Sequence, residues 1–185
     1  MRRIAALLIT LAMPTMALAE RLRVDVLIFL NPPPLQQHAT AARHPDNERA
    51  IGIDDLRGLA YAGIALLPEN ASSLASEWAT LSANRSYRPL LRLSWLQEAP
   101  DSERGPAMRI YLPGGDGQSS LEGWLRLQGG GMHPALMADL ESVQTTAGGN
   151  ALGYRLKQRR SLPLNTLHYL DSPRIGVLAR VSPAR

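Results

Sequence analysis

The chain has 185 residues, of which 20 are Lys or Arg, 16 are Asp or Glu and none is Cys, so its formal net charge is +4 at pH 7. The absence of cysteine excludes disulfides, thiolate metal sites and cysteine nucleophiles. This small charge excess does not indicate a nucleic-acid-binding protein, and the length suits one domain that buries its core without a metal or disulfide.

Residues 1–19 have the pattern of a secretory signal peptide. Arginines at positions 2 and 3 form a positive start, an apolar run follows, and Ala17 to Ala19 is a small-x-small cleavage site. The run is shorter than the ~20 residues that a membrane-spanning helix needs. We therefore expect export to the periplasm, cleavage near Ala19 and no stable membrane insertion afterwards.

The remaining residues, 20–185, are predicted to form one domain. The segment RLRVDVLIFL, 21–30, is rich in large apolar and β-branched residues and predicts a strand that is buried on both faces. Residues 31–50 contain three consecutive prolines and many polar side chains, which favours a flexible loop. A short apolar segment ending in a turn follows at 61–70.

Apolar residues at helical spacing predict a helix in the first half of the chain. Leu74, Trp78 and Leu81 lie four and three positions apart, which places them on one face of a helix. Ser72 or Ser73 could cap its start and Asn84 could end it. Trp78 is therefore interpreted as a core contact of this helix.

From Tyr87 onward the hydrophobic period changes to two, which is typical of strands with one buried face. Alternating runs occupy residues 87–97, 108–112, 121–128, 154–164 and 175–183. The segment 132–141 is ambiguous between helix and strand. The predicted class is α+β, a mostly antiparallel sheet arranged as a meander, with one or two helices packed on one face.

Four reactive side-chain types lie together near the end of the chain, in LHYLDS. Ser172, His168 and Asp171 include the residues of a hydrolase triad, but the chain has no GxSxG turn that would expose a serine nucleophile. Histidines and acids also lack the spacing of a metal site, so we expect neither a metal nor a cofactor. The preferred interpretation is a structural corner in which Asp171 pairs with a guanidinium; its residues are Arg159, Arg160, His168, Tyr169 and Asp171.

Arginine and aromatic side chains recur on the polar faces of the predicted strands. If these faces share one side of the sheet, they form a platform that could hold carboxylates and contact sugars. The candidate ligand-binding residues are Arg92, Arg109, Tyr111, Trp124 and Arg126; Arg155, Arg159 and Arg180 also lie on polar faces. A solvated sheet face whose arginines pair with nearby acids remains an alternative.

The order of four motifs resembles the CsiV family of periplasmic peptidoglycan-binding proteins. The motifs are VDVLIFLNP, SYRPLLRLSWLQ, LEGWLRL and RRSLPLNTLHYLDSPRIGVLARVSP. The resemblance spans most of residues 20–185, and the terminal LHYLD-P--GVL block is its most specific part. Ser172 stands where the family usually has His.

This resemblance implies a non-enzymatic protein that binds peptidoglycan and supports cell-wall assembly. Its implied protein partner is a cell-wall synthase, namely a class A penicillin-binding protein, or the protein that activates this synthase. Two alternatives remain open: a protein-protein adaptor that does not bind glycan, and a cell-wall hydrolase or esterase using Ser172 and His168.

Overall fold

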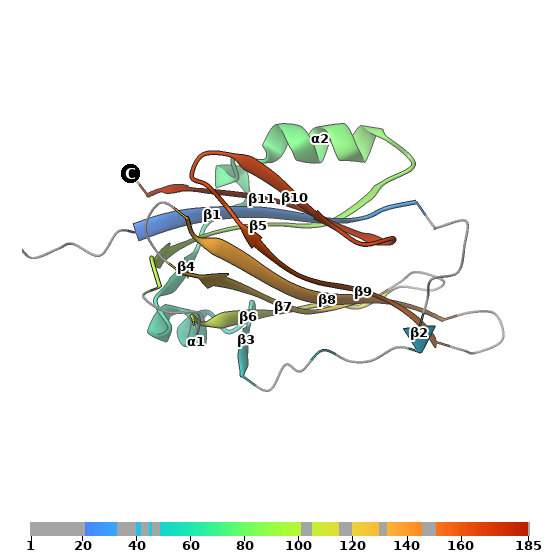
Figure 1. Cartoon of the computed structure of the whole chain (residues 1–185), viewed down its shortest axis with the longest axis horizontal. Coiled ribbons are helices and arrows are strands. Elements are labelled where there is room, and N and C mark those ends of the chain that lie inside the picture. Colours follow the sequence, from blue (N-terminus) through green and yellow to red (C-terminus); the bar gives the residue numbers. More distant parts are fainter. Residues whose placement is uncertain are drawn as a thin grey trace, which may run out of the picture.

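The computed structural model describes residues 21–32, 40, 41, 45, 49–100, 105–114, 120–129, 133–145 and 151–184. The predicted signal peptide and most of the predicted flexible loop lie outside these residues. The described strands form two sheets that lie face to face (Figure 1). Within the described ranges no helix is long and apolar enough to cross a membrane.

Sheet A contains five strands in the order β10-β11-β1-β5-β4, and every pairing in it is antiparallel. Its central strand β1 pairs with β11 on one side and β5 on the other, and it is buried on both faces as predicted. The bounds are β1 Arg21–Leu30, β4 Ile64–Leu66, β5 Arg88–Glu98, β10 Leu167–Asp171 and β11 Ile175–Pro183.

Sheet B contains six strands in the order β2-β9-β8-β7-β6-β3. Strands β6 to β9 form an antiparallel meander, while β3 runs parallel to β6. The bounds are β2 Thr40–Ala41, β3 Ala50–Gly52, β6 Ala107–Leu112, β7 Ser120–Gln128, β8 Ala135–Thr145 and β9 Ala151–Ser161.

One hydrophobic core fills the space between the two sheets. Alternate residues of β1, including Val24, Val26 and Ile28, belong to the same buried cluster as Leu125 of β7 and Leu140 of β8. Because side chains alternate between the faces of a strand, the residues between these positions point to the outside of each sheet. Each sheet therefore has an inner face in the core and an outer face that can carry other contacts.

Side chains of β9 join the edges of the two sheets. The amide of Gln158 donates a 2.7 Å hydrogen bond to the backbone carbonyl of Asp171, and Arg160 Nη2 donates one of 3.2 Å to the carbonyl of Tyr169. Strand β10 is the outermost strand of sheet A on this side. These bonds satisfy carbonyl groups that an exposed sheet edge would leave unpaired.

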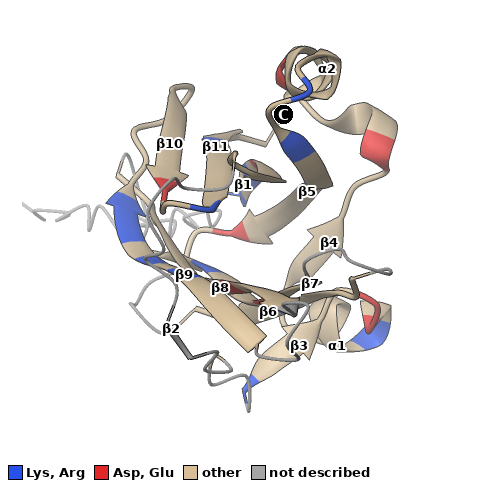
Figure 2. Ribbon diagram, turned by 90° about the vertical axis from the view of Figure 1, so that its right-hand side faces the viewer, with Lys and Arg blue, Asp and Glu red and all other residues tan. Residues whose placement is uncertain are grey.

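Helix α2, Ala75–Ala83, covers the outer face of sheet A (Figures 1 and 2). Leu74 is fully buried with Leu27 and Phe29, and Trp78 and Leu81 pack against this cluster, so the predicted helical face is confirmed. The N-cap residue of α2 is Leu74, whose side chain cannot accept a capping hydrogen bond. Neither Ser72 nor Ser73 is therefore the N-cap residue.

A buried carboxylate ties the segment before α2 to sheet A. Asp25, which is 1% exposed, accepts hydrogen bonds from the Arg23 guanidinium, the Ser94 hydroxyl, and both the amide and the hydroxyl of Ser73. Arg23 also donates to the carbonyl of Ala71, in the 3-10 turn η1, Glu69–Ala71. The entry to α2 is thereby fixed by charge as well as by apolar packing.

The second helix, α1, Leu56–Tyr61, lies between β3 and β4 in the chain and inserts Leu59 into the core between the sheets. The prediction of a mostly antiparallel fold with few helices is confirmed. The structure has two sheets in place of the single predicted sheet. Its helices do not share one face, because α2 lies on the outer face of sheet A and α1 packs toward the shared core. Residues 132–141, ambiguous in the sequence, belong largely to strand β8.

Candidate functional site

The outer face of sheet B brings together most of the predicted Arg and aromatic platform. Residues 109 and 111 of β6 face outward beside residues 124 and 126 of β7, because Arg109 pairs with Trp124 and Ala107 with Arg126 in the antiparallel register. Strand β9 adds Arg155, Lys157 and Arg159 to the same face by alternation.

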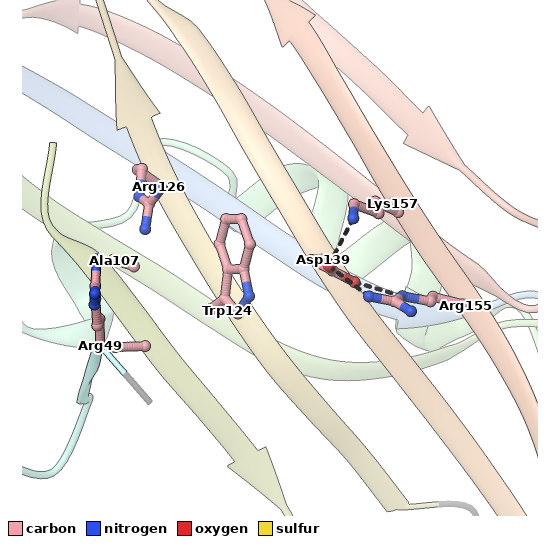
Figure 3. A pocket seen from close by; sticks show the side chains of 8 residues that line it. Arg49, Ala107, Trp124, Arg126, Asp139, Arg155 and Lys157 are labelled. Atoms are coloured by element: carbon pink, nitrogen blue, oxygen red, sulfur yellow. Dashed lines mark hydrogen bonds and ion pairs between the residues drawn. The ribbon is translucent and has the colours of Figure 1, made fainter. Parts of the chain in front are cut away.

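A hollow of about 500 Å³ lies on this face, and we refer to it as the basic pocket (Figure 3). Its lining comes from five strands of sheet B, β3 and β6 to β9, and from Arg49, the residue before β3. The lining residues are Arg49, Ala50, Ala107, Trp124, Arg126, Asp139, Arg155 and Lys157. Four of these side chains are cationic and one is acidic, so the pocket has a positive charge.

The acid of the basic pocket is already bound to a cation. Asp139, 3% exposed, accepts hydrogen bonds of 2.7 Å from Nε and Nη2 of Arg155, and Lys157 Nζ lies 3.8 Å from its Oδ2 (Figure 3). The hydrogen bonds with Asp139 raise the pKa of Arg155, which therefore stays charged. This fixed group forms one wall of the pocket.

Arg126 has a different environment on the opposite wall. Its guanidinium carbon lies 4.9 Å from the centroid of the Trp124 ring, which is within the range of a cation-π contact. Within the described residues Arg126 makes no salt bridge, and its buried Nε has no hydrogen-bond partner. The ring thus positions a guanidinium that no described protein group neutralises.

Gly123 allows Trp124 and Asp139 to lie side by side. Its φ of +141° is strained for residues with a side chain, and an added Cβ would lie 2.1 Å from the carbonyl oxygen of Asp139. The close approach of β7 and β8 at this point therefore depends on glycine. Trp124 is paired with Asp139 in the register, so both walls of the pocket are positioned by this contact.

A second hollow adjoins the basic pocket along β6. It is lined by Arg109 and Tyr111, by Glu122 of β7, and by Ile53 and Asp54 before α1. Tyr111 is 62% exposed. The predicted platform residues on sheet B are therefore divided between two adjoining hollows.

Arg92 does not belong to this group, although the sequence places it in the predicted platform. It lies on β5 of sheet A, where its guanidinium carbon is 5.5 Å from the Trp78 ring centroid and its Nη2 donates to Glu69. Alternation within a strand identifies an outer face but does not tell which sheet the strand joins. Arg180 likewise lies on sheet A, where it bonds to Ser73 and Glu77.

The predicted structural corner is divided in a similar way. Arg160 contacts β10 through the carbonyl of Tyr169, but Arg159 faces outward and donates to Gln128. The carboxylate of Asp171 is exposed and forms no salt bridge within the described part of the chain. The link between β9 and β10 therefore uses backbone carbonyls as acceptors in place of the expected Asp171 ion pair.

Tyr169 and His168 point to opposite faces of β10. The Tyr169 ring stacks on Phe29 with centroids 6.1 Å apart, and burial raises the pKa of its hydroxyl. Gly176 permits this arrangement, since a Cβ there would lie 2.4 Å from the Phe29 ring. His168 Nε2 is buried and has no hydrogen-bond partner among the described residues.

Ser172 is part of the turn between β10 and β11. Its Oγ accepts a 3.1 Å hydrogen bond from the amide of Ile175, and its own amide donates to the Ile175 carbonyl. In the ranges that the structure describes, no hydrogen bond joins Ser172 to His168. The nucleophile-base geometry of a hydrolase is therefore not formed by these two residues.

Three charged residues of the pocket lie outside the platform predicted from the sequence, namely Arg49, Asp139 and Lys157. Asp139 lies in the segment of ambiguous structure, and Arg49 lies in the predicted loop. Assigning residues 135–145 to a strand would have placed Asp139 on the same face as its neighbours in β7 and β9. Within the described ranges, no group of three or more His, Asp or Glu side chains could hold a metal ion.

Comparison with known proteins identifies a family that matches the chain. The family described as "Peptidoglycan-binding protein, CsiV" has a model that matches residues 3–184. No curated protein and no solved structure matches the chain. The family match covers nearly the whole chain, so the resemblance of the sequence motifs is confirmed.

Proposed function

The chain belongs to the CsiV family of peptidoglycan-binding proteins, and we propose that it binds peptidoglycan through the outer face of sheet B, at the basic pocket. The observation that supports this location is Arg126, a guanidinium held against Trp124 with no acidic partner in the described residues. Arginine forms bidentate hydrogen bonds with carboxylates, which peptidoglycan carries in its peptides.

We further propose that this binding is non-enzymatic and occurs in the periplasm. The family description names binding and no reaction. The signal-like pattern of residues 1–19 and the location of peptidoglycan outside the cytoplasm support export. In this proposal the protein supports cell-wall assembly by contacting both the wall and a synthase or its activator.

Co-sedimentation with purified sacculi tests wall binding and cleavage together. We expect the mature protein to pellet with sacculi and to release no soluble fragments. Soluble muropeptides in the supernatant would indicate a hydrolase or esterase instead. A protein that stays in the supernatant and releases no fragments would fit an adaptor that does not bind peptidoglycan.

A pair of charge-matched variants locates the binding face. Arg126→Gln with Lys157→Gln removes two positive charges from the basic pocket, whereas Arg57→Gln with Arg85→Gln removes two exposed arginines outside it. The first pair should reduce pelleting, and the control pair should pellet like the unmodified protein. Equal pelleting of both pairs would place the binding face elsewhere.

The protein partner needs a separate measurement. Immobilised mature protein should retain a purified activator of a class A penicillin-binding protein in the absence of peptidoglycan. If the activator is not retained while sacculi still pellet the protein, the partner proposal is lost and peptidoglycan binding remains.

A further inference from the structure

We infer that the basic pocket recognises the carboxylates of peptidoglycan stem peptides, and not the faces of the glycan sugars. This inference rests on the proposed function and specifies the part of peptidoglycan that the pocket contacts. It is carried by the arrangement of charge in the pocket and by the position of Arg126 over Trp124.

Cationic side chains outnumber acidic ones in the basic pocket. Arg155 is bound by two hydrogen bonds to Asp139, and Lys157 lies within ion-pair distance of the same carboxylate. Asp139 is the acidic residue of the lining, so Arg49 and Arg126 have no acidic partner within it. An anion entering the hollow would meet cations on both walls, with no exposed carboxylate to repel it, because Asp139 is 3% exposed.

Trp124 is the aromatic side chain that lines the basic pocket. Sugars stack on aromatic rings through an open ring face. One face of Trp124 is occupied by the Arg126 guanidinium, with the guanidinium carbon 4.9 Å from the ring centroid. The ring therefore serves as a support for the cation, which leaves the pocket poorly suited to stacking a sugar on that face.

Arg126 can contact the Trp124 ring and still donate hydrogen bonds to a ligand. A guanidinium has five N–H donors, and a contact with a ring does not occupy all of them. Arg126 makes no salt bridge within the described chain. A carboxylate in the hollow could accept from its Nη groups and also approach Lys157, which is 59% exposed.

The chemistry of peptidoglycan then selects the ligand. In an intact strand the lactyl carboxyl of each muramic acid is consumed in the amide bond to the stem peptide, so the sugars carry no free acid. The free carboxylates belong to the acidic and terminal residues of the stem. A hollow of about 500 Å³ is within the size range of pockets that hold small ligands, which suits a short peptide segment.

Competition on sacculi tests this inference with the full mature protein. The probes are a synthetic stem tetrapeptide, the same peptide with all its carboxylates amidated, and a neutral N-acetylglucosamine oligomer. We expect the free peptide to displace the protein from sacculi and to bind at least about tenfold more tightly than the amidated peptide, with no displacement by the oligomer. Binding of the free peptide should also weaken as salt concentration rises.

A single substitution connects the ligand to the pocket. Arg126→Gln should weaken binding of the free peptide by about tenfold or more, while Arg85→Gln, an exposed arginine outside the pocket, should leave it unchanged. Thermal unfolding of both variants checks that each retains the fold.

The outcomes separate this inference from the proposed function. Equal affinity for the free and amidated peptides, or displacement by the sugar oligomer, would overturn the inference while pelleting with sacculi still supports peptidoglycan binding. Unchanged peptide binding by Arg126→Gln would move recognition away from the basic pocket. Failure of the unmodified protein to pellet with sacculi would overturn the proposed function, and the inference with it.

Discussion

The carboxylate of Asp139 accepts hydrogen bonds of 2.7 Å from both Nε and Nη2 of Arg155, across neighbouring strands of sheet B. Asp139 is 3% exposed, so its removal would leave the Arg155 guanidinium without this partner at a half-buried position. The pair therefore contributes to stability as well as to the charge of the basic pocket.

Asp139→Asn should lower the free energy of unfolding by about 1–3 kcal/mol, since a partly buried charged donor loses its ionised acceptor. Chemical denaturation at neutral pH measures the change. Glu69→Gln is the control, because Glu69 pairs with Arg92 but its side chain is 68% exposed. An exposed pair contributes about 0–1 kcal/mol, so equal losses in the two variants would contradict the structural role of Asp139.

The Asp25 network predicts a dependence of stability on pH. Burial by itself would raise the pKa of Asp25, but hydrogen bonds from Arg23, Ser94 and Ser73 outweigh burial and lower it. A carboxyl whose pKa is lower in the folded state stabilises the fold above the pKa of an unfolded aspartate, about 4. That contribution is lost as the pH falls through the lower folded-state pKa.

Asp25→Asn should therefore be less stable than the unmodified protein at pH 7, by about 1–3 kcal/mol. The difference should shrink as the pH is lowered below about 4, where the unmodified protein also loses the charge. Melting temperatures of both proteins across this range provide the measurement. A difference that stays constant between pH 7 and pH 2 would show that the charge of Asp25 has no part in the effect.

The glycine between the two pocket walls should resist substitution. Gly123→Ala places a methyl group against the backbone of β8 at an unfavourable φ, so we expect a loss of about 3 kcal/mol or more. Gly63→Ala is matched to it, because Gly63 also has a positive φ, +77°, but a Cβ there meets nothing within 4 Å. The control should lose only about 1 kcal/mol, and similar losses at both positions would argue against a close approach of β7 and β8.

Stability and ligand binding should be separable through helix α2. Leu74→Ala removes a fully buried side chain from the contact of α2 with sheet A, which should cost about 2–4 kcal/mol. Below its melting temperature the variant should still pellet with sacculi, because the basic pocket lies on the outer face of the other sheet. Loss of pelleting by a folded Leu74→Ala protein would link α2 to the binding face.

Local periodicity predicted much of the secondary structure. Strands β1, β5, β6, β7 and β11 appear where apolar alternation or a continuous apolar run predicts them. Strand β8 was ambiguous because apolar Met137 shares its outer face with Asp139, while polar Ser142 lies on its inner face, which weakens the contrast between its two sides. Strand β10 has apolar partners on both faces, Tyr169 against Phe29 and Leu170 in the core, and its five residues were interpreted as a corner.

The pairing of distant strands is what local patterns could not predict. The sequence predicts Arg109 and Trp124 on one face of the sheet. The register of β6 with β7 confirms this, because it makes them cross-strand neighbours on the same face. Arg92 has the same local pattern, but β5 pairs with β1 and β4, which places it in sheet A. A site built from five strands depends on these long-range pairings, so its residues could be proposed individually but not assembled.

Chemical-shift mapping tests the binding face most directly. Backbone and tryptophan indole resonances of the isotope-labelled mature protein would be followed while a soluble muropeptide monomer is added. We expect the largest changes at Trp124 and Arg126 of β7 and at their neighbours Asp139, Arg155 and Lys157. Changes confined to α2, β10 and β11, on the side of sheet A, would contradict binding at the basic pocket.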